Sequence, residues 1–334
     1  MQNNVEVSII CVTYNQEKYI EKAIKSFLMQ KTNFNYEIII HDDASTDRTQ
    51  QIIKSYEAKY PNLVRTIIEE KNVHSQDKSV FEHSLINVNG KYIAMCDGDD
   101  FWTDEYKLQK QYDALEKNPN CFSCVHIVAT CNEDESPNVV VKPSKKYNLK
   151  EGIIKQDDFA KLLFVRASTK CPFQTTSYFY RKEVALEALS SNWCIGRRKY
   201  FDANMLKLFL IYGDVYFVNE ILSMHRKNAI NSITDATKKD KSIRPHEMLK
   251  LIKEDLNFDK YTNNKYHKYL MTEVYNYLLY TKEIKINEKE NKELMKEYNL
   301  SNFGFIKYSG LKRLILHFFN DSFLLKKYTN IAKK

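Results

Sequence analysis

The stretch VEVSIICV, from Val5 to Val12, is a short run of β-branched and apolar residues near the start of the chain. Its length and composition predict a buried strand. Further runs of this kind at residues 36–41, 63–68 and 91–96 alternate with segments in which apolar residues recur at helical spacing. Strands that alternate with helices predict an α/β fold, in which helices cover both faces of a mainly parallel sheet.

The composition excludes several common classes of protein. The 334 residues suffice for one large domain or two modest ones. The seven glycines form neither Gly-x-Gly-x-x-Gly nor Gly-x4-Gly-Lys-Ser/Thr, so the usual dinucleotide and Walker-type phosphate loops are absent. No apolar run reaches the roughly 18–20 residues that span a bilayer, and the first residues do not have the pattern of an export signal.

Seven cysteines, an odd number, stand largely within apolar runs. Reduced thiols fit this pattern better than a disulfide framework, so we expect a cytoplasmic protein. Cys121-x-x-Cys124, with His126 and Cys131 nearby, also allows a zinc site. However, residues 121–128 alternate in the manner of a buried strand, which favours a structural role.

Two acidic clusters follow directly on predicted strands. Asp42-Asp43 follows the strand at 36–41, and Asp97-Gly98-Asp99-Asp100 follows the strand at 91–96. In a parallel sheet both clusters lie at the carboxyl edge, where ligands bind. Neighbouring carboxylates repel one another unless a cation neutralises them, and Mg²⁺ is typically held by one or two carboxylates together with substrate phosphates. The pattern therefore predicts a diphosphate ligand bridged by a metal, although an acidic turn that caps the next helix is an alternative.

Three segments in order resemble those of family-2 glycosyltransferases, which are inverting enzymes with the GT-A fold. Residues 7–15 resemble the opening strand, residues 37–49 the second strand with its acidic turn, and residues 90–102 the DXD segment. The resemblance implies a GT-A, Rossmann-like mixed but mainly parallel sheet flanked by helices. We expect this domain at residues 1–230, with a nucleotide-sugar half (1–130) and an acceptor half (131–230). The helical pattern and the charge of the remaining residues predict a basic, mainly helical C-terminal extension at 231–334.

The resemblance assigns roles to the matching residues. Asp43 would hydrogen-bond the base, typically uracil, while Asp99 and Asp100 would hold ribose, diphosphate and an Mn²⁺ or Mg²⁺ ion. Trp102 would shape the sugar or acceptor pocket, with core packing as the alternative. The residues expected to bind the nucleotide sugar are Thr13, Tyr14, Asn15, Glu17, Asp43, Asp97, Gly98, Asp99, Trp102 and Arg226.

An inverting transfer needs a general base for the acceptor hydroxyl. Members of the family place this base as an Asp at the start of a helix in the second half, and Asp202 stands at the matching place. Asp158 and Asp214 compete for the role, and Asp202 also fits a helix cap.

One departure concerns the Arg-x-His that many relatives carry after the next strand. Here the sequence is His225-Arg226-Lys227-Asn228, so Asn228 stands where the His would be and His225 is displaced. A histidine contact with the metal or the diphosphate is therefore in question, whereas Arg226 is still expected to reach a phosphate.

The charge is unevenly distributed. Residues 231–334 hold 21 Lys and Arg against 13 Asp and Glu, which accounts for the whole net charge of +8. Apolar residues at 311, 314, 315 and 318 recur at helical spacing beside Lys312 and Arg313. A basic amphipathic helix predicts peripheral contact with the inner face of the cytoplasmic membrane, where a lipid-linked acceptor would lie. The alternatives are a solvated Lys-rich face, or packing on the catalytic domain or a partner chain.

Together these patterns predict a metal-dependent hexosyl- or N-acetylhexosaminyltransferase. It would move a sugar from a nucleotide sugar, expected to be a UDP-sugar, to a hydroxyl of a glycan or lipid-linked acceptor in cell-surface polysaccharide synthesis. A catalytically silent nucleotide-sugar binder and a phosphatase-like hydrolase of the haloacid dehalogenase type, using Asp97 and Asp99, are the alternatives. The neutral first 230 residues speak against a nucleic-acid binder. The sequence does not name the sugar, the acceptor, the linkage or the oligomeric state.

Overall fold

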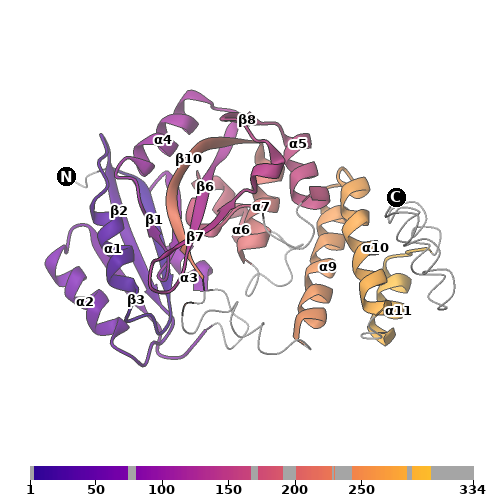
Figure 1. Ribbon diagram of the computed structural model, residues 1–334, viewed down its shortest axis with the longest axis horizontal. Coiled ribbons are helices and arrows are strands. Elements are labelled where there is room, and N and C mark those ends of the chain that lie inside the picture. Colours follow the sequence, from indigo (N-terminus) through magenta and orange to yellow (C-terminus); the bar gives the residue numbers. More distant parts are fainter. Residues whose placement is uncertain are drawn as a thin grey trace. The chain divides into compact units, whose positions relative to one another are not determined.

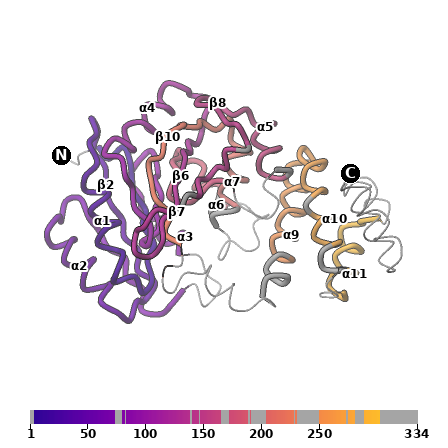
Figure 2. Tube along the Cα trace, viewed as in Figure 1, coloured from indigo at the N-terminus to yellow at the C-terminus, as the bar shows by residue number. Residues whose placement is uncertain are grey.

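A computed structural model describes residues 4–73, 80–166, 172–190, 201–227, 229, 243–283 and 288–301 (Figures 1 and 2). The chain divides into two compact units, residues 1–239 and 240–334. The domain boundary predicted after residue 230 and the amphipathic segment predicted at 311–318 lie outside the described residues.

The first unit is built on one mixed sheet with the strand order β3-β2-β1-β4-β9-β6-β10-β5, in which β7 also pairs with β6 and β8 with β10. The strands are β1 (Val5–Thr13), β2 (Asn35–Asp42), β3 (Val64–Ile68), β4 (Tyr92–Asp97), β5 (Phe101–Trp102), β6 (Cys121–Cys131), β7 (Pro137–Lys142), β8 (Gly152–Ile154), β9 (Phe179–Arg181) and β10 (Asp214–Arg226). The helices are α1 (Ile20–Leu28), α2 (Thr49–Lys59), α3 (Val80–Ile86), α4 (Lys107–Lys117), α5 (Gln156–Ala160), α6 (Lys182–Ser190) and α7 (Phe201–Tyr212). Shorter helical turns are Lys145–Tyr147, Lys161–Arg166 and Thr175–Ser177.

Helices cover both faces of this sheet. Alternate residues of β1, among them Val7 and Ile9, pack into one buried cluster with residues of α1, α2 and α4. On the other face α6 contacts both α3 and α7, and the Phe209 ring of α7 lies 5.3 Å from that of Tyr178 and 5.4 Å from that of Tyr180. Side chains alternate between the faces of a strand, so the apolar strands hold both helix layers, and the α/β prediction is confirmed.

Parallel pairing aligns the ends of the first strands. The strand β1 runs parallel to β2 and β4, and β2 runs parallel to β3. In register, Thr13 pairs with Asp42, Val12 with Asp97, and Asp42 with Ile68. Both acidic clusters therefore lie at one carboxyl edge of the sheet, as their positions after the strands predict.

The cysteines in the described part of the first unit are buried and free, and they are Cys11, Cys96, Cys121, Cys124 and Cys131. Cys121, Cys124 and Cys131 all lie on β6. In the described ranges, they do not join His126 in a group that could hold a metal ion. The zinc alternative is thus not supported, because β6 is a core strand.

The second unit is helical over the residues described. It contains α9 (Ile243–Tyr261), α10 (His267–Glu283) and α11 (Glu288–Glu297). The rings of Phe258 and Tyr266 stack with centroids 5.9 Å apart, and the Tyr298 hydroxyl donates to Oδ1 of Asn257 over 2.9 Å. In the portion of the chain that the structure covers, no helix combines the length and the apolar character needed to cross a bilayer.

Candidate active site

Backbone hydrogen bonds bring the ends of β1, β2 and β4 together. The N–H of Asp43 donates to the carbonyl of Thr13 over 3.0 Å, and the N–H of Gly98 donates to the carbonyl of Val12 over 2.9 Å. The predicted base-binding and DXD residues are thus immediate neighbours of the first turn after β1.

That first turn is tied to the loop after β2. Asn15 has a positive φ of 51°, and its Oδ1 accepts a hydrogen bond from the N–H of Thr46 over 2.7 Å. The Glu17 carboxylate accepts from the N–H of Arg48 over 3.0 Å. The side chains of Asn15 and Glu17 therefore hold the shape of the edge, while Tyr14 is 38% exposed.

Gly98 is required by close packing. A Cβ at this position would lie 2.8 Å from Oγ1 of Thr13 and 2.4 Å from Oε1 of Gln16. Those two side chains are themselves joined, since the Thr13 hydroxyl donates to Gln16 over 2.8 Å. Only glycine leaves room for the turn Asp97–Asp100, here called the DXD turn, to approach β1 this closely.

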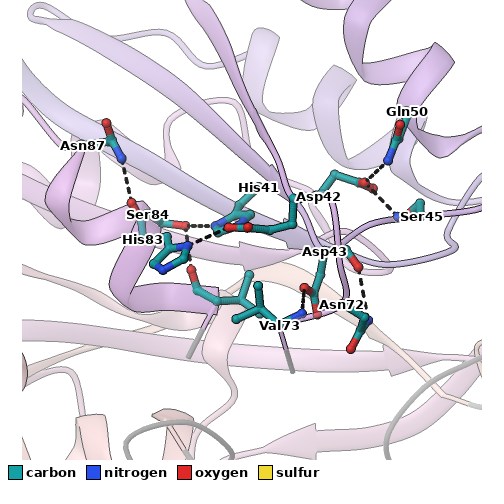
Figure 3. Close-up of polar contacts among 12 residues, drawn as sticks. His41, Asp42, Asp43, Ser45, Gln50, Asn72, Val73, His83, Ser84 and Asn87 are labelled. Atoms are coloured by element: carbon teal, nitrogen blue, oxygen red, sulfur yellow. Dashed lines mark hydrogen bonds and ion pairs between the residues drawn. The ribbon is translucent and has the colours of Figure 1, made fainter. Parts of the chain in front are cut away.

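The two carboxylates after β2 have different surroundings (Figure 3). Asp42 accepts hydrogen bonds from the N–H of Ser45 over 2.9 Å and from Nε2 of Gln50 over 2.8 Å. Asp43, which is 2% exposed, accepts from the N–H of Val73 over 2.5 Å. Asp42 thus organises the loop, whereas Asp43 is joined to the segment after β3. The hydrogen bond of Asp43 with the uracil ring of a nucleotide stays a prediction.

The end of β10 holds the last carboxylate of the DXD turn. The N–H of Arg226 donates to Oδ1 of Asp100 over 2.9 Å, and Nδ1 of His225 lies 3.2 Å from both carboxylate oxygens. Burial acts to lower the pKa of His225, but the adjacent Asp100 carboxylate outweighs it and raises that pKa. The displaced histidine is therefore at the site, and only strand pairing across the sheet could have revealed it.

Asp99 and Asp100 fit a hard divalent cation. Burial, and then the charge of Asp100, raise the pKa of Asp99 to about 7, and a cation bound here would favour the charged form of both carboxylates. In the described ranges, Asp97, Asp99, Asp100 and His225 do not place three ligand atoms within 4.8 Å of one another. A cation here would thus complete its coordination with other oxygens, such as those of a diphosphate.

The side chain of Arg226 is held beside the DXD turn. Its side chain is 2% exposed, and its guanidinium donates to the carbonyls of Asp99 and Glu133, each over 3.0 Å, and pairs with Glu135 over 3.3 Å. These bonds use three of the five N–H donors of the guanidinium, so the contact with a phosphate stays a prediction. In the structure Arg226 positions the DXD turn.

Trp102 lies in the core rather than at a pocket. The side chain is 2% exposed, its ring is 4.8 Å from that of Phe27, and Nζ of Lys107 lies 4.0 Å from the ring centroid. The prediction that Trp102 shapes the sugar or acceptor pocket is therefore corrected to core packing, because β5 turns this side chain toward α1 and α4.

The three candidate bases are spread over the fold. Asp202 is the second residue of α7, and its side chain lies outside what the structure describes. Asp214 begins β10, whereas Asp100 binds the last residue of that strand. At about 3.3 Å per residue, roughly 40 Å of strand separates the two.

Asp158 lies near Asp214 along the fold. The segment just before it, Lys155 and Gln156, binds the Asp214 carboxylate over 2.8 Å and 3.1 Å. Asp158 itself pairs with Lys161 over 2.9 Å, and its side chain is 66% exposed. Both competitors therefore lie toward the amino edge of the sheet, away from the DXD turn. Neither position suits the general base.

Comparisons with known proteins agree with this geometry. A family model for glycosyl transferase family 2 matches residues 8–189. The uncharacterized protein Rv1520 of Mycobacterium tuberculosis is 32% identical over 231 residues, which are 67% of this chain and 59% of that protein. The putative glycosyltransferase EpsE of Bacillus subtilis is 37% identical over 118 residues, 35% of this chain and 41% of EpsE. The chain thus spans less than two thirds of the curated relatives it matches.

Among solved structures, S. aureus TarS 1-349 in complex with UDP-GlcNAc aligns with a TM-score of 0.57 and 16% sequence identity. The alignment covers 93% of this chain and 78% of that one. This likeness establishes the fold, a GT-A sheet flanked by helices. The family model covers more than half of the chain, including every strand that positions the DXD turn except β10. The chain therefore belongs to glycosyl transferase family 2.

Proposed function

We propose that this protein is a metal-dependent inverting glycosyltransferase that takes its sugar from a nucleoside diphosphate sugar. The observation that carries the proposal is the DXD turn at the carboxyl edge, where Asp99 has a pKa raised to about 7 next to Asp100. Burial is the larger cause of this raised pKa and the charge of Asp100 the second. A cation that is held by both carboxylates and by a diphosphate would offset both effects. A phosphatase-like role for Asp97 and Asp99 would leave the buried Asp43, beside them, without a function.

A uridine nucleotide is the donor that the edge favours. Asp43 lies one residue beyond β2 and next to Thr13, and a carboxylate can accept the N3–H of a uracil or thymine ring. TarS, which shares the fold, forms complexes with UDP and UDP-GlcNAc. We therefore propose a UDP-sugar, of the hexosyl or N-acetylhexosaminyl type.

In the proposed reaction, a divalent cation held by Asp99 and Asp100 would stabilise the negative charge that develops on the leaving diphosphate. Asp202 accepts the proton of the acceptor hydroxyl while that oxygen attacks the anomeric carbon from the face opposite the diphosphate. The bond to the diphosphate oxygen breaks, and the configuration of the anomeric carbon inverts. His225 and the N–H of Arg226 keep the Asp100 carboxylate in place.

The direction of α7 supports Asp202 as this base. The last residue of α7, Tyr212, has its ring 5.4 Å from that of Phe122 at the start of β6, and the N–H of Asp214 donates to the carbonyl of Asn120 over 3.2 Å. A 12-residue helix is about 18 Å long. Because α7 ends where β6 and β10 begin, at the amino ends of these two parallel strands, we propose that its first turn, with Asp202, lies toward the carboxyl edge.

The acceptor is proposed to be a hydroxyl of a glycan or of a lipid-linked intermediate in surface-polysaccharide synthesis, on the cytoplasmic side of the membrane. The basic C-terminal region would contribute peripheral contact with anionic lipid, and residues 302–334 lie outside the described part of the chain.

The test is a panel of UDP-, dTDP- and GDP-sugars incubated with the full chain and Mn²⁺, with release of the nucleoside diphosphate as the readout. The proposal predicts release from at least one sugar nucleotide and loss of release with EDTA. Release that EDTA leaves unchanged would refute the metal dependence. UDP binding without release from any donor, with acceptor glycans present, would favour the silent binder instead.

A further inference from the structure

A second group of side chains that could bind a metal lies near the carboxyl edge of the sheet. His41 is the last residue but one of β2, Glu69 follows β3 directly, and His83 belongs to α3. Nε2 of His41 lies 3.0 Å from Oε1 of Glu69, and Nδ1 of His83 lies 2.6 Å from the same oxygen. The two imidazole rings, labelled in Figure 3, stack with centroids 6.0 Å apart and an interplanar angle of 11°.

These three residues offer ligand atoms that all lie within 4.8 Å of one another. Over the described ranges of the chain, no other three His, Cys, Asp or Glu residues do so. We propose that His41, Glu69 and His83 bind a divalent transition-metal ion of the zinc class. Two imidazoles and one carboxylate, with a coordination position left open, suit Zn²⁺. The all-oxygen chemistry at Asp99 and Asp100 suits Mn²⁺ or Mg²⁺ instead.

Ser84 orients the buried ligand. Its Oγ lies 2.8 Å from Nδ1 of His41 and donates to the carbonyl of Val80, four residues earlier on α3, over 3.3 Å. With an ion bound, Nδ1 of His41 would donate to Ser84, and Nε2 would be free to coordinate the ion on the side occupied by Glu69. A hydrogen bond from the second ring nitrogen to a neighbouring group is what fixes most metal-binding histidines.

The alternative is a purely structural network, in which both imidazoles donate a proton to the same Glu69 oxygen and Ser84 donates to His41. This arrangement needs no ion, and it would also tie α3 to β2. The two readings differ in one measurable property, because only the first gives the protein an affinity for zinc that depends on these side chains.

The three side chains range from fully buried to half-exposed, so an ion could reach the site from solvent. The side chain of His41 is fully buried, that of Glu69 is 19% exposed and that of His83 is 48% exposed. The buried His41 is held from two sides, by Ser84 at Nδ1 and by Glu69 at Nε2. His83 thus faces solvent, which gives an ion a route to a rigid, buried anchor.

A bound ion would join three elements that border the predicted base site. The N–H of Glu69 donates to the carbonyl of Asp42 over 3.0 Å, and Asn72 and Val73, three and four residues later, hydrogen-bond Asp43. Binding to the folded state alone stabilises that state. The ion would therefore raise the melting temperature of the protein by linking β2, the segment after β3 and α3.

The experiment uses the full chain after treatment with a chelator and its removal. Zn²⁺ binding is measured by calorimetry, Co²⁺ binding by its visible ligand-field bands, and the melting temperature with and without Zn²⁺. We expect one zinc-class ion per chain that His83→Gln and Glu69→Gln bind at least about tenfold more weakly. The matched control is His267→Gln, because Nδ1 of His267 also faces a carboxylate, that of Asp259, over 2.6 Å in the second unit.

Equal Zn²⁺ affinity in the wild-type chain and His83→Gln would overturn the proposal, as would a wild-type chain that does not bind Zn²⁺. His83 is half-exposed at the surface, so its replacement should leave the fold intact. UDP binding with Mn²⁺, measured on the same proteins, reports on the proposed function separately. A chain that binds UDP and Mn²⁺ but no Zn²⁺ therefore refutes only this inference.

Discussion

The backbone N–H of Arg226 donates to Oδ1 of Asp100 over 2.9 Å and joins residues that are 126 positions apart. Nδ1 of His225 lies 3.2 Å from both oxygens of the same carboxylate. The end of β10 therefore fixes a carboxylate that the turn after β4 supplies. The DXD turn acquires its geometry from two distant parts of the chain.

His225→Ala should weaken Mn²⁺-dependent UDP binding by about tenfold, because Asp100 loses the side chain that orients it. Calorimetric titration of UDP in the presence of Mn²⁺ measures the effect. His267→Ala, a change in the second unit, is the control and should leave UDP binding unchanged. An affinity of His225→Ala equal to that of the wild type would show that the contact is dispensable.

Asp99→Asn should stabilise the metal-free protein at neutral and higher pH. The pKa of Asp99 is raised from 3.8 to about 7 in the folded protein. At a pH between these two values, Asp99 is therefore protonated in the folded protein and ionised in the unfolded chain. The stability of the wild type is therefore lowered progressively as pH rises from about 4 to 7, and the full penalty persists above 7.

The melting temperature without metal measures this effect. At pH 8 the Asn variant should melt a few degrees above the wild type, and the difference should vanish toward pH 4. Added Mn²⁺ with UDP should raise the melting temperature of the wild type alone. A variant that is less stable at pH 8 would contradict the repulsion between Asp99 and Asp100.

Asp202→Asn should lower turnover by about 10²–10⁴-fold, the usual contribution of a general base, and leave UDP affinity nearly unchanged. Asp158→Asn and Asp214→Asn are matched controls, since both residues lie toward the opposite edge and bind Lys161 and Lys155. Steady-state kinetics on the preferred donor would separate kcat from KM. Unchanged turnover in Asp202→Asn would remove this residue as the base.

Local patterns in the sequence predicted the part of the site that depends on strand ends. Buried β-branched runs place Thr13, Asp43 and Asp97 at one edge, and parallel pairing confirms that arrangement. Residues 137–160 include Pro137 and Pro143, yet they form β7, β8 and α5. These short strands are stabilised by pairing with β6 and β10, which no local pattern encodes.

The positions of Trp102 and His225 also depend on strand pairing, which their local sequence does not encode. Trp102 lies two residues after Asp100, but the two-residue strand β5 pairs with β10 and turns its ring into the core. His225 lies out of register with the family motif, but the end of β10 brings it to Asp100. The group formed by His41, Glu69 and His83 comes from three separate elements and is recognised only in three dimensions.

Lys107 gives a further prediction on pH. Its side chain is fully buried and donates to Oε1 of Gln111 over 2.6 Å, and burial lowers the pKa of Lys107 to about 7. Between pH 7 and 10.5 the unfolded chain carries a proton on Lys107 that the folded protein lacks. The contribution of Lys107 to the free energy of unfolding therefore rises with pH in this window.

Urea unfolding at pH 7.5 and 9.5 tests this sign. The free energy of unfolding of the wild type, relative to Lys107→Met, should rise by up to about 2 kcal/mol between the two values. Lys110→Met is the control, because the Lys110 ammonium bonds Asp104 and Glu220 at the surface and its pKa is raised. A constant difference between wild type and Lys107→Met would show that Lys107 stays charged in the fold.

The most direct test of the account is the affinity of the full chain for UDP with Mn²⁺ and with EDTA, measured by calorimetry on the wild type, Asp99→Asn and Asp158→Asn. The account predicts at least about tenfold tighter binding with Mn²⁺ in the wild type and in Asp158→Asn, and loss of this gain in Asp99→Asn. Equal UDP affinity with and without Mn²⁺ in all three proteins, or no binding of UDP to the wild type, would contradict it.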